Sequence, residues 1–245
     1  MRLVGKAALI TGATGAIGGA IARRFVAAGA RVVVSGSRAA WAVSPDGARY
    51  VPADLTDEDA VRSLVTTAVA ELSGLDILVN AHGIDYHSDL VATPLEDVER
   101  VLAVNVVGAL LTMKYAIPAM IEAGGGAIIN LASRLGSVAI PGQAVYSASK
   151  GALIMLSRGA AIDVAKHKIR VNCVAPGVTA TPMIDVWIAE QADPIAFSER
   201  VVGAIPLRRM ATVDDVAAAT LFLASDEAAY ITGAVLPVDG GYTAA

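Results

Sequence analysis

Several residue types are scarce in this sequence, and each shortage narrows the class of protein. The 245 residues include one cysteine, Cys173, so no internal disulfide can form, and we expect its thiol to be a small buried hydrophobe in a strand. Charged residues make up only 17% and the net charge is −4, without a run of lysine or arginine. A nucleic-acid partner is therefore not expected, because such proteins usually carry a basic patch. We also predict no metal site.

Long uninterrupted apolar segments are missing too, although hydrophobic residues make up 55% of the chain. The longest uncharged stretches, residues 7–22 and 135–149, contain glycines or a proline and fall short of the roughly 18 apolar residues that a membrane span needs. Residues 1–6 lack the charged and then apolar pattern of a secretory leader. We expect a soluble, cytoplasmic protein with no membrane partner, forming one domain over residues 1–245 because no stretch resembles a linker.

Short apolar runs alternate with longer segments of helical spacing. Runs of this kind predict strands buried on both faces, and their alternation with helices predicts a parallel sheet covered on both sides. We therefore predict an α/β, Rossmann-like, doubly wound and mostly parallel sheet. Strands are expected near residues 7–10, 31–35, 49–51, 75–79, 127–131, 169–174 and 234–238, and helices near 17–28, 57–72, 95–122, 145–166 and 214–224.

One connection is unusually short. About a dozen residues separate the strand that ends near Ser35 from the strand near Arg49, and they include Pro45, Asp46 and Gly47. That is close to the minimum for a helical crossover. We expect a short or irregular helix there.

Three glycines follow the first predicted strand, in the segment Thr11–Gly18. A strand, a glycine-rich turn and a helix form a dinucleotide pyrophosphate site, since glycines let the backbone approach the phosphates and a helix N-terminus favours negative charge. An ordinary strand-to-helix turn that merely needs glycine is the alternative. We favour the dinucleotide site because the turn follows the first strand near the start of the chain.

The choice between NAD and NADP depends on the end of the second strand. An acidic side chain there binds the ribose 2′-hydroxyl of NAD, whereas an arginine accepts the 2′-phosphate of NADP. This chain has Gly36, Ser37 and Arg38 at that point, and Arg38 could pair with a phosphate. We favour NADP(H) over NAD(H), with a solvated loop arginine as the alternative.

Tyr146 and Lys150 lie four positions apart in a predicted helix, which places them on one face. An ammonium beside a phenol favours the phenolate, so we expect Lys150 to lower the pKa of Tyr146 and to make it a general acid/base. Ser133 follows a predicted strand, where ligands bind in open parallel sheets, and its hydroxyl could hydrogen-bond a substrate oxygen. The alternatives are a chance surface pair and a turn serine.

Over nearly its full length the chain resembles the short-chain dehydrogenase/reductase family, in its shorter, single-domain branch. Ser133 precedes Tyr146 by the 13 positions common in that family, and Tyr146 with Lys150 supplies its signature pair. The other matching features are the glycine turn, Asn80 after the fourth strand, Asn105 in Val104-Asn105-Val106, Pro176-Gly177 after the sixth strand, and Val238-Asp239-Gly240-Gly241 near the C-terminus.

The resemblance implies a role for each matching residue. Tyr146 would exchange a proton with the substrate oxygen, Ser133 would orient that oxygen, and Lys150 would hold the nicotinamide ribose. Asn105 would anchor a water in a proton relay through Lys150. Asp54 and Leu55 would contact the adenine, Asn80 would line the cofactor cleft, and residues near Thr179 would approach the nicotinamide. The full expected cofactor site is Gly12, Thr14, Gly15, Ile17, Gly18, Ser37, Arg38, Asp54, Leu55, Asn80, Tyr146, Lys150, Pro176, Gly177, Thr179 and Thr181.

Two features depart from the family pattern. Gly15 stands one place before the usual second glycine, where this chain has Ala16, a spacing that resembles the extended branch containing sugar epimerases. The segment Asn80-Ala81-His82-Gly83 replaces the usual N-N-A-G. His82 could touch the substrate or only fill space; we favour the structural role, and we interpret His87 as a loop residue.

The resemblance implies an oxidoreductase that transfers a hydride between a nicotinamide cofactor and a carbonyl or secondary alcohol, on a 3-oxoacyl, polyol, sugar or cyclic substrate. Alternatives are a cofactor-binding regulator without turnover, an isomerase using bound cofactor, and a lyase like the halohydrin dehalogenases, which carry arginine at the lysine position. A substrate lid is expected at about residues 183–210, whose acidic residues offer no anion clamp. A homo-oligomer, commonly a tetramer in this family, is also expected.

Overall fold

The computed structural model describes residues 2–40 and 47–244. Seven parallel strands form one sheet in the order β3-β2-β1-β4-β5-β6-β7, so the predicted doubly wound α/β fold is confirmed. The short helix expected around Pro45 and Asp46 falls outside the described residues. The strands are β1 (Ala7–Thr11), β2 (Arg31–Gly36), β3 (Ala48–Pro52), β4 (Ile77–Asn80), β5 (Gly126–Leu131), β6 (Ile169–Pro176) and β7 (Val235–Val238).

Central strands carry apolar side chains toward both faces of the sheet, as a parallel sheet covered on both sides requires. Leu9 of β1 belongs to one core cluster and Ile10 to the other, because successive side chains point to opposite faces. Cys173 of β6 is fully buried, as predicted. The fourth strand begins at Ile77 rather than near Leu75, which lies buried in the turn before it.

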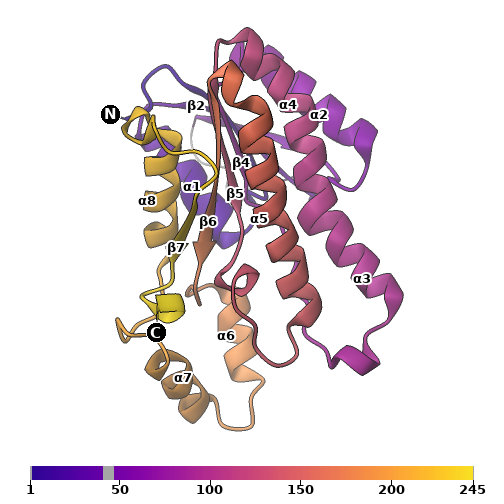
Figure 1. Cartoon of the computed structure of the whole chain (residues 1–245), viewed down its shortest axis with the longest axis vertical. Helices are drawn as coiled ribbons and strands as arrows, with labels where there is room; N and C mark the ends of the chain where they lie inside the picture. The colour runs from indigo at the N-terminus through magenta and orange to yellow at the C-terminus, as the bar shows by residue number, and fades with distance from the viewer. Residues whose placement is uncertain (1, 41–46, 245) are drawn as a thin grey trace.

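Helices cover the two faces in two groups (Figure 1). On one face α1 (Ala16–Ala27) packs against α8 (Val213–Ala224), and on the other α2 (Glu58–Leu72) packs against α4 (Gly108–Glu122), beside α5 (Ala144–Val164). The predicted start of the second helix is confirmed to within a residue, since Asp57 is its N-cap and accepts hydrogen bonds from the N–H groups of Asp59 and Ala60. Such caps satisfy donors that the first helical turn leaves free.

The segment predicted as one helix over 95–122 is continuous but changes its winding. It consists of α3 (Leu95–Leu102), a π-helical turn at Ala103–Val107 and α4. Length and composition alone would let residues 95–122 cross a membrane, yet 44% of the most apolar window is buried inside the fold. This long helix therefore packs into the core of the α/β fold.

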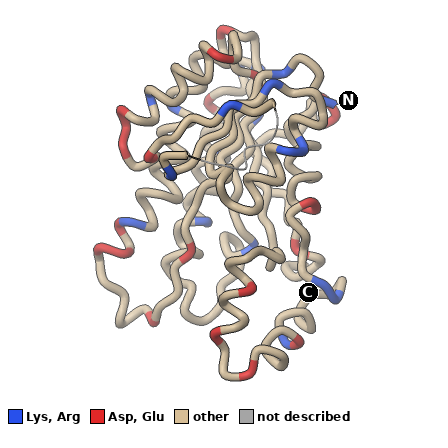
Figure 2. The backbone as a smooth tube through the Cα atoms, turned by 180° about the vertical axis from the view of Figure 1, so that it is seen from behind, with Lys and Arg blue, Asp and Glu red and all other residues tan. Residues whose placement is uncertain are grey.

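Two further helices, α6 (Pro182–Ala189) and α7 (Pro194–Gly203), lie beyond the carboxyl ends of the strands (Figure 1). They contact each other through Trp187 and Phe197, whose rings meet edge to face at 4.7 Å. Together they occupy the segment predicted as a lid. Figure 2 shows that acidic and basic positions are both spread along the described part of the backbone.

Candidate active site

The glycine turn forms a tight cradle between β1 and the N-terminus of α1. Gly12 adopts a φ of +67°, and a Cβ there would lie 2.5 Å from the backbone N of His82. A Cβ on Gly18 would lie 2.3 Å from the carbonyl oxygen of Gly12. Gly15 is the N-cap of α1 and has more room, with its nearest contact at 3.3 Å. The backbone can therefore approach a pyrophosphate at a helix N-terminus, as dinucleotide binding requires.

A cleft of about 490 Å³ runs from this cradle to the catalytic candidates. Its walls include most of the cofactor residues expected from the sequence, so the fold brings together segments far apart in the chain. The predicted residues along it are Gly12, Thr14, Gly15, Ile17, Gly18, Arg38, Tyr146, Lys150, Pro176 and Thr181.

An adjoining hollow of about 300 Å³ continues the cleft past Gly36, and Ser37, Asp54 and Leu55 line it. A Cβ on Gly36 would come within 2.7 Å of the Thr14 side chain, so a longer residue there requires Thr14 to shift. The Asp54 carboxylate accepts hydrogen bonds from the N–H and hydroxyl of Thr56, which lower its pKa. These groups make this end of the site polar.

Ser133, Tyr146 and Lys150 meet at the carboxyl end of β5. Tyr146 and Lys150 lie one turn apart on α5, with the Lys150 Nζ 5.7 Å from the centre of the Tyr146 ring. The Lys150 ammonium donates to the carbonyl oxygen of Leu131 at 2.9 Å. Ser133 Oγ accepts a hydrogen bond from the N–H of Leu135 at 3.1 Å. The serine therefore also caps a turn, which was the alternative to a role in catalysis. Its hydroxyl remains in hydrogen-bond reach of Tyr146.

Burial is the main cause of the pKa shifts of Tyr146 and Lys150, and the shift of Tyr146 corrects one prediction. The pKa of Tyr146 is raised to about 12, first by burial and then by the negative charge of Asp85, while the hydrogen bond with Ser133 acts in the opposite direction. The expected lowering by Lys150 is therefore wrong for this geometry, because burial disfavours the phenolate more strongly. Burial likewise lowers the pKa of Lys150 to about 8.

Asn105 lies in the π-helical turn and holds the loop after β4 against the helix. Its Oδ1 accepts from the N–H of Ile84 at 2.8 Å, and its Nδ2 donates to the Ile84 carbonyl and to Ser149 Oγ, each at 3.0 Å. A Cβ on Gly83 would lie 3.1 Å from Lys150 Nζ and 3.2 Å from Asn105 Oδ1. Asn105 and Lys150 thus flank the same small space, and π-helical turns are frequent at functional sites.

His82 lies beside the cradle and lines both the cofactor cleft and the adjoining hollow. Its Nδ1 lies 2.7 Å from Thr11 Oγ1, and its Nε2 is shielded from solvent near the Val104 carbonyl, without the alignment of a regular hydrogen bond. Burial and then the nearby Lys150 charge lower the pKa of His82 to about 3. The ring is therefore neutral at physiological pH. His87 lies in the exposed loop and packs against Gly142.

Three other predicted residues lie at the edges of the site or beneath it. Asn80 is buried under the cleft rather than along its wall; its side chain donates to Asn130 at 2.8 Å and accepts from Thr112 at 2.8 Å. Thr181 is the N-cap of α6 and reaches the cleft. Thr179 donates to the Gly177 carbonyl, and both residues line a further pocket.

This further pocket has a volume of about 250 Å³ and opens beside Ser133 and Tyr146. Apolar side chains from α6, including Met183, Ile184 and Trp187, form one wall. Sequence reasoning missed three polar residues of the pocket, although each has a signal in its position. Asp85 lies two positions after Gly83, Arg134 directly follows Ser133, and Gln143 lies one turn before Tyr146.

Comparison with known proteins agrees with this geometry. A family model described as enoyl-(acyl carrier protein) reductase matches residues 12–243. The chain is 37% identical to 2-(R)-hydroxypropyl-CoM dehydrogenase of Xanthobacter autotrophicus, covering 98% of this chain and 99% of the relative. Its structure resembles a putative short-chain dehydrogenase/reductase from Burkholderia xenovorans, with 37% identity, a TM-score of 0.94 and coverage of 100% of this chain and 98% of that one. It also resembles an NAD⁺-bound xylitol dehydrogenase, with 30% identity, a TM-score of 0.93 and coverage of 98% of this chain and 100% of that one.

Fold and site define an oxidoreductase that acts on alcohol or carbonyl groups of small molecules with an NAD(P) cofactor. The chain belongs to the short-chain dehydrogenase/reductase family, whose dehydrogenases act on CH–OH donors.

Proposed function

We propose that this enzyme interconverts a small secondary alcohol and its carbonyl compound, with Tyr146 as the acid/base. The observation that carries the proposal is the position of Tyr146, which lines both the cofactor cleft and the pocket of about 250 Å³ beside Ser133. A substrate oxygen in the pocket can thus reach the phenol while its carbon faces the cleft. Ser133, which lines the same pocket, would hold that oxygen by a hydrogen bond.

The raised pKa sets the protonation state of Tyr146 at neutral pH. At neutral pH Tyr146 is a phenol, which donates its proton to the substrate oxygen as reduction proceeds. The bound nicotinamide supplies or accepts the hydride. In alcohol oxidation the proton moves from the substrate hydroxyl to Tyr146 in its phenolate form, and we propose that Lys150, with Asn105 behind it, passes that proton onward and holds the ribose.

We further propose that the enzyme prefers NADP(H). Arg38 lines the cofactor cleft just beyond β2, and the strand ends at Gly36, which carries no acidic side chain. A guanidinium at that point suits a 2′-phosphate. The adenosine would lie against Ser37, Asp54 and Leu55.

This preference predicts the effect of Arg38→Ala. We expect the KM for NADPH to rise by about tenfold or more, since a charge-assisted hydrogen bond contributes roughly 1.5–3 kcal/mol, with the KM for NADH changed less than threefold. Steady-state kinetics with both cofactors measure this, and Arg23→Ala, a substitution on the exposed side of α1, is the matched control. Preference for NADH in the unmodified enzyme would overturn the assignment and leave the reaction in place.

We propose that residues 183–210 act as the substrate lid and that the chain works as a cytoplasmic homotetramer of single-domain subunits. The apolar pocket wall formed by α6 supports the lid. Exposed apolar side chains on the outer helices, such as Leu110, Met155 and Ile162, support self-association. Within the reaction class, 3-oxoacyl, polyol and sugar substrates all remain candidates; the xylitol dehydrogenase neighbour acts on a polyol by its name.

Turnover by the purified enzyme tests the reaction directly. Nicotinamide absorbance is followed with NADPH or NADH and a panel of small ketones, and with the oxidised cofactors and secondary alcohols. Cofactor oxidation or reduction that depends on a carbonyl or alcohol supports the proposal. Tight cofactor binding without turnover on any compound would instead support a regulator.

A further inference from the structure

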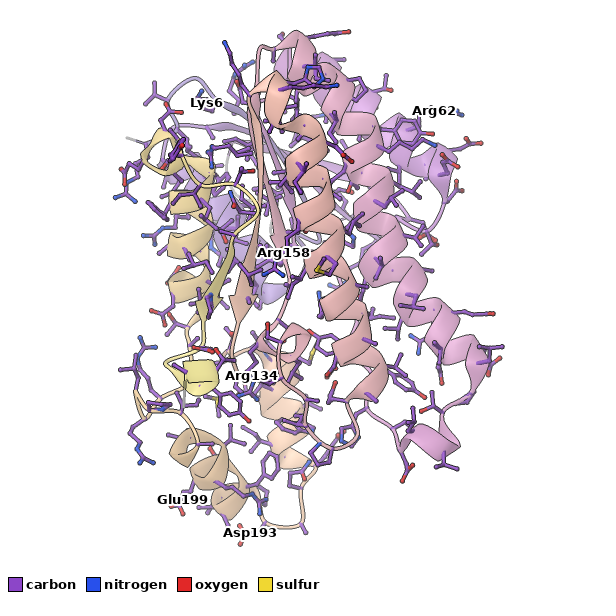
Figure 3. The ribbon with its side chains drawn as sticks, viewed as in Figure 1. Lys6, Arg62, Arg134, Arg158, Asp193 and Glu199 are labelled. Atoms are coloured by element: carbon purple, nitrogen blue, oxygen red, sulfur yellow. The ribbon has the colours of Figure 1, made fainter. Side chains whose placement is uncertain are left out.

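Arg134 is the residue directly after Ser133, in the short helical turn Arg134–Gly136. It lines the substrate pocket but not the cofactor cleft. In Figure 3 it lies near the carboxyl ends of the strands, whereas Arg62 on α2 is at the far end of the molecule. The reaction proposed above makes no use of this guanidinium.

The state of Arg134 is unusual for a charged side chain. It is half-buried, and its guanidinium forms no hydrogen bond or ion pair with any residue in 2–40 or 47–244. It stacks on the Tyr242 ring at 3.8 Å from the ring centre. The nearby Asp239 carboxylate attracts the Arg134 charge but makes its hydrogen bonds elsewhere, because it accepts from the N–H groups of Gly241 and Thr243 and from the Thr243 hydroxyl.

A partly desolvated guanidinium without a partner is well suited to bind an anion. Burial lowers the pKa of Arg134, which means that the charged form has lost hydration. The stack on Tyr242 holds the guanidinium plane in place, so little order is lost when a ligand binds. The arginine fork matches the two oxygens of a carboxylate, and a bidentate pair in a sheltered pocket is strong.

The charges in the pocket also orient a ligand. Asp85 lines both the pocket and the cofactor cleft, and its negative charge raises the pKa of Tyr146. The Asp85 charge therefore disfavours an anionic group at the junction with the cofactor, and Arg134 attracts one at the other end, with the neighbouring Asp239 charge opposing part of that attraction. The acidic lid residues offered no anion clamp in the sequence, whereas Arg134 places a cationic side chain directly after Ser133.

We propose that Arg134 binds a carboxylate of the substrate, so that the enzyme acts on small hydroxy acids or oxo acids. This inference rests on the proposed hydride-transfer function and names its substrate class. The reacting carbon lies at Ser133 and Tyr146, and the carboxylate lies at the end of the pocket away from the cofactor. A pocket of about 250 Å³ corresponds to roughly eight water volumes in the liquid, so it accommodates a short acid.

The test compares acids with uncharged partners of the same shape. Both enantiomers of 3-hydroxybutyrate, 4-hydroxyvalerate and 5-hydroxyhexanoate are assayed beside their primary amides and beside neutral secondary alcohols. We expect kcat/KM for at least one acid to exceed that for its amide by about tenfold or more. In Arg134→Met that acid should lose about 30- to 100-fold in kcat/KM, mainly through KM, whereas the amides should change less than threefold.

Two other variants sharpen the result. Arg134→Lys keeps the charge but loses the fork, and we expect an intermediate loss of about five- to tenfold for the acid. Arg62→Met removes an arginine from the exposed face of α2 and should leave every rate unchanged, which controls for net charge. Cofactor binding by each variant shows that it is folded.

The proposal is overturned if the acids have no advantage over the amides, if neither is turned over, or if Arg134→Met affects both alike. Turnover of neutral secondary alcohols by the unmodified enzyme under any of these outcomes would leave the hydride-transfer function standing. Absence of turnover with every alcohol and ketone would instead contradict the proposed hydride-transfer function itself.

Discussion

His82 shows how one residue couples the cofactor cradle to the stability of the protein. Its imidazole is enclosed beside Thr11 and has a pKa of about 3 in the folded chain, compared with about 6.5 when unfolded. Between these values the unfolded chain binds the extra proton, so the free energy of unfolding falls as the pH drops from 6.5 toward 3. Above 6.5 the ring is neutral in both states and this penalty is absent.

The substitution His82→Ala tests this linkage. At pH 7.5 we expect a loss of about 1–3 kcal/mol, because the Thr11 bond and the packed ring are removed. Between pH 6.5 and 4, however, the variant should lose less stability than the unmodified chain, by up to about 1.4 kcal/mol per pH unit. Urea unfolding followed by circular dichroism at several pH values measures both effects.

His87→Ala is the matched control, since that histidine lies in an exposed loop. It should retain the pH dependence of the unmodified chain. A slope in His82→Ala identical to that of the unmodified chain would show that another group causes the acid sensitivity.

Residue types and spacing predicted which catalytic side chains meet, but not their electrostatics. The four-residue interval of Tyr146 and Lys150, together with Ser133 after a strand, was enough to place the three together. The acidity of Tyr146 depends on burial and on Asp85, which come from segments distant in the sequence. For the same reason Arg134 was not singled out, because its lack of a partner is visible only once Asp239 is seen to bond the C-terminal turn.

At the scale of elements, the glycines of the turn between β1 and α1 differ in how closely backbone atoms approach them. Gly12 and Gly18 are in positions where a Cβ would collide with backbone, whereas Gly15 has its nearest contact at 3.3 Å. The unusual spacing of this turn therefore retains the two glycines that close packing requires. Gly15, at the N-cap of α1, instead lines the cofactor cleft.

These contacts predict different outcomes for two alanine substitutions. Gly18→Ala should force the helix away from the turn, weakening NADPH binding by tenfold or more and lowering the free energy of unfolding by about 1–3 kcal/mol. Gly15→Ala should cost less than 1 kcal/mol in stability while still reducing cofactor affinity. Fluorescence titration with NADPH and thermal unfolding measure the two quantities. Equal destabilisation by both substitutions would contradict the proposed packing.

Element types and order were predictable because buried parallel strands have a strong local signature. Strand boundaries were less certain: Leu75 is as apolar as the strand after it, but it lies in the turn before β4. The π-helical turn at residues 103–107 had no local signal either. It depends on Asn105 bonding the loop after β4, which is a tertiary interaction.

At the scale of the whole molecule, the sheet order brings the cleft and the pocket to one edge. The chain crosses between opposite sides of the sheet at β1 and β4, and ligands of open α/β sheets bind at such a switch point. Cofactor residues come from the segments after β1, β2 and β4, and substrate residues from the turn after β5 and from α5 and α6. Tyr146 is where the two groups meet.

The substitution Tyr146→Phe therefore tests the central claim most directly. It keeps the ring and removes only the hydroxyl, so the Kd for NADPH should stay within about threefold of the unmodified value. Single-turnover hydride transfer to a carbonyl substrate, followed by nicotinamide absorbance, should slow by about 10³-fold or more, a loss consistent with removing a general acid. Hydride transfer at a tenth or more of the unmodified rate, with cofactor binding intact, would contradict Tyr146 as the acid/base.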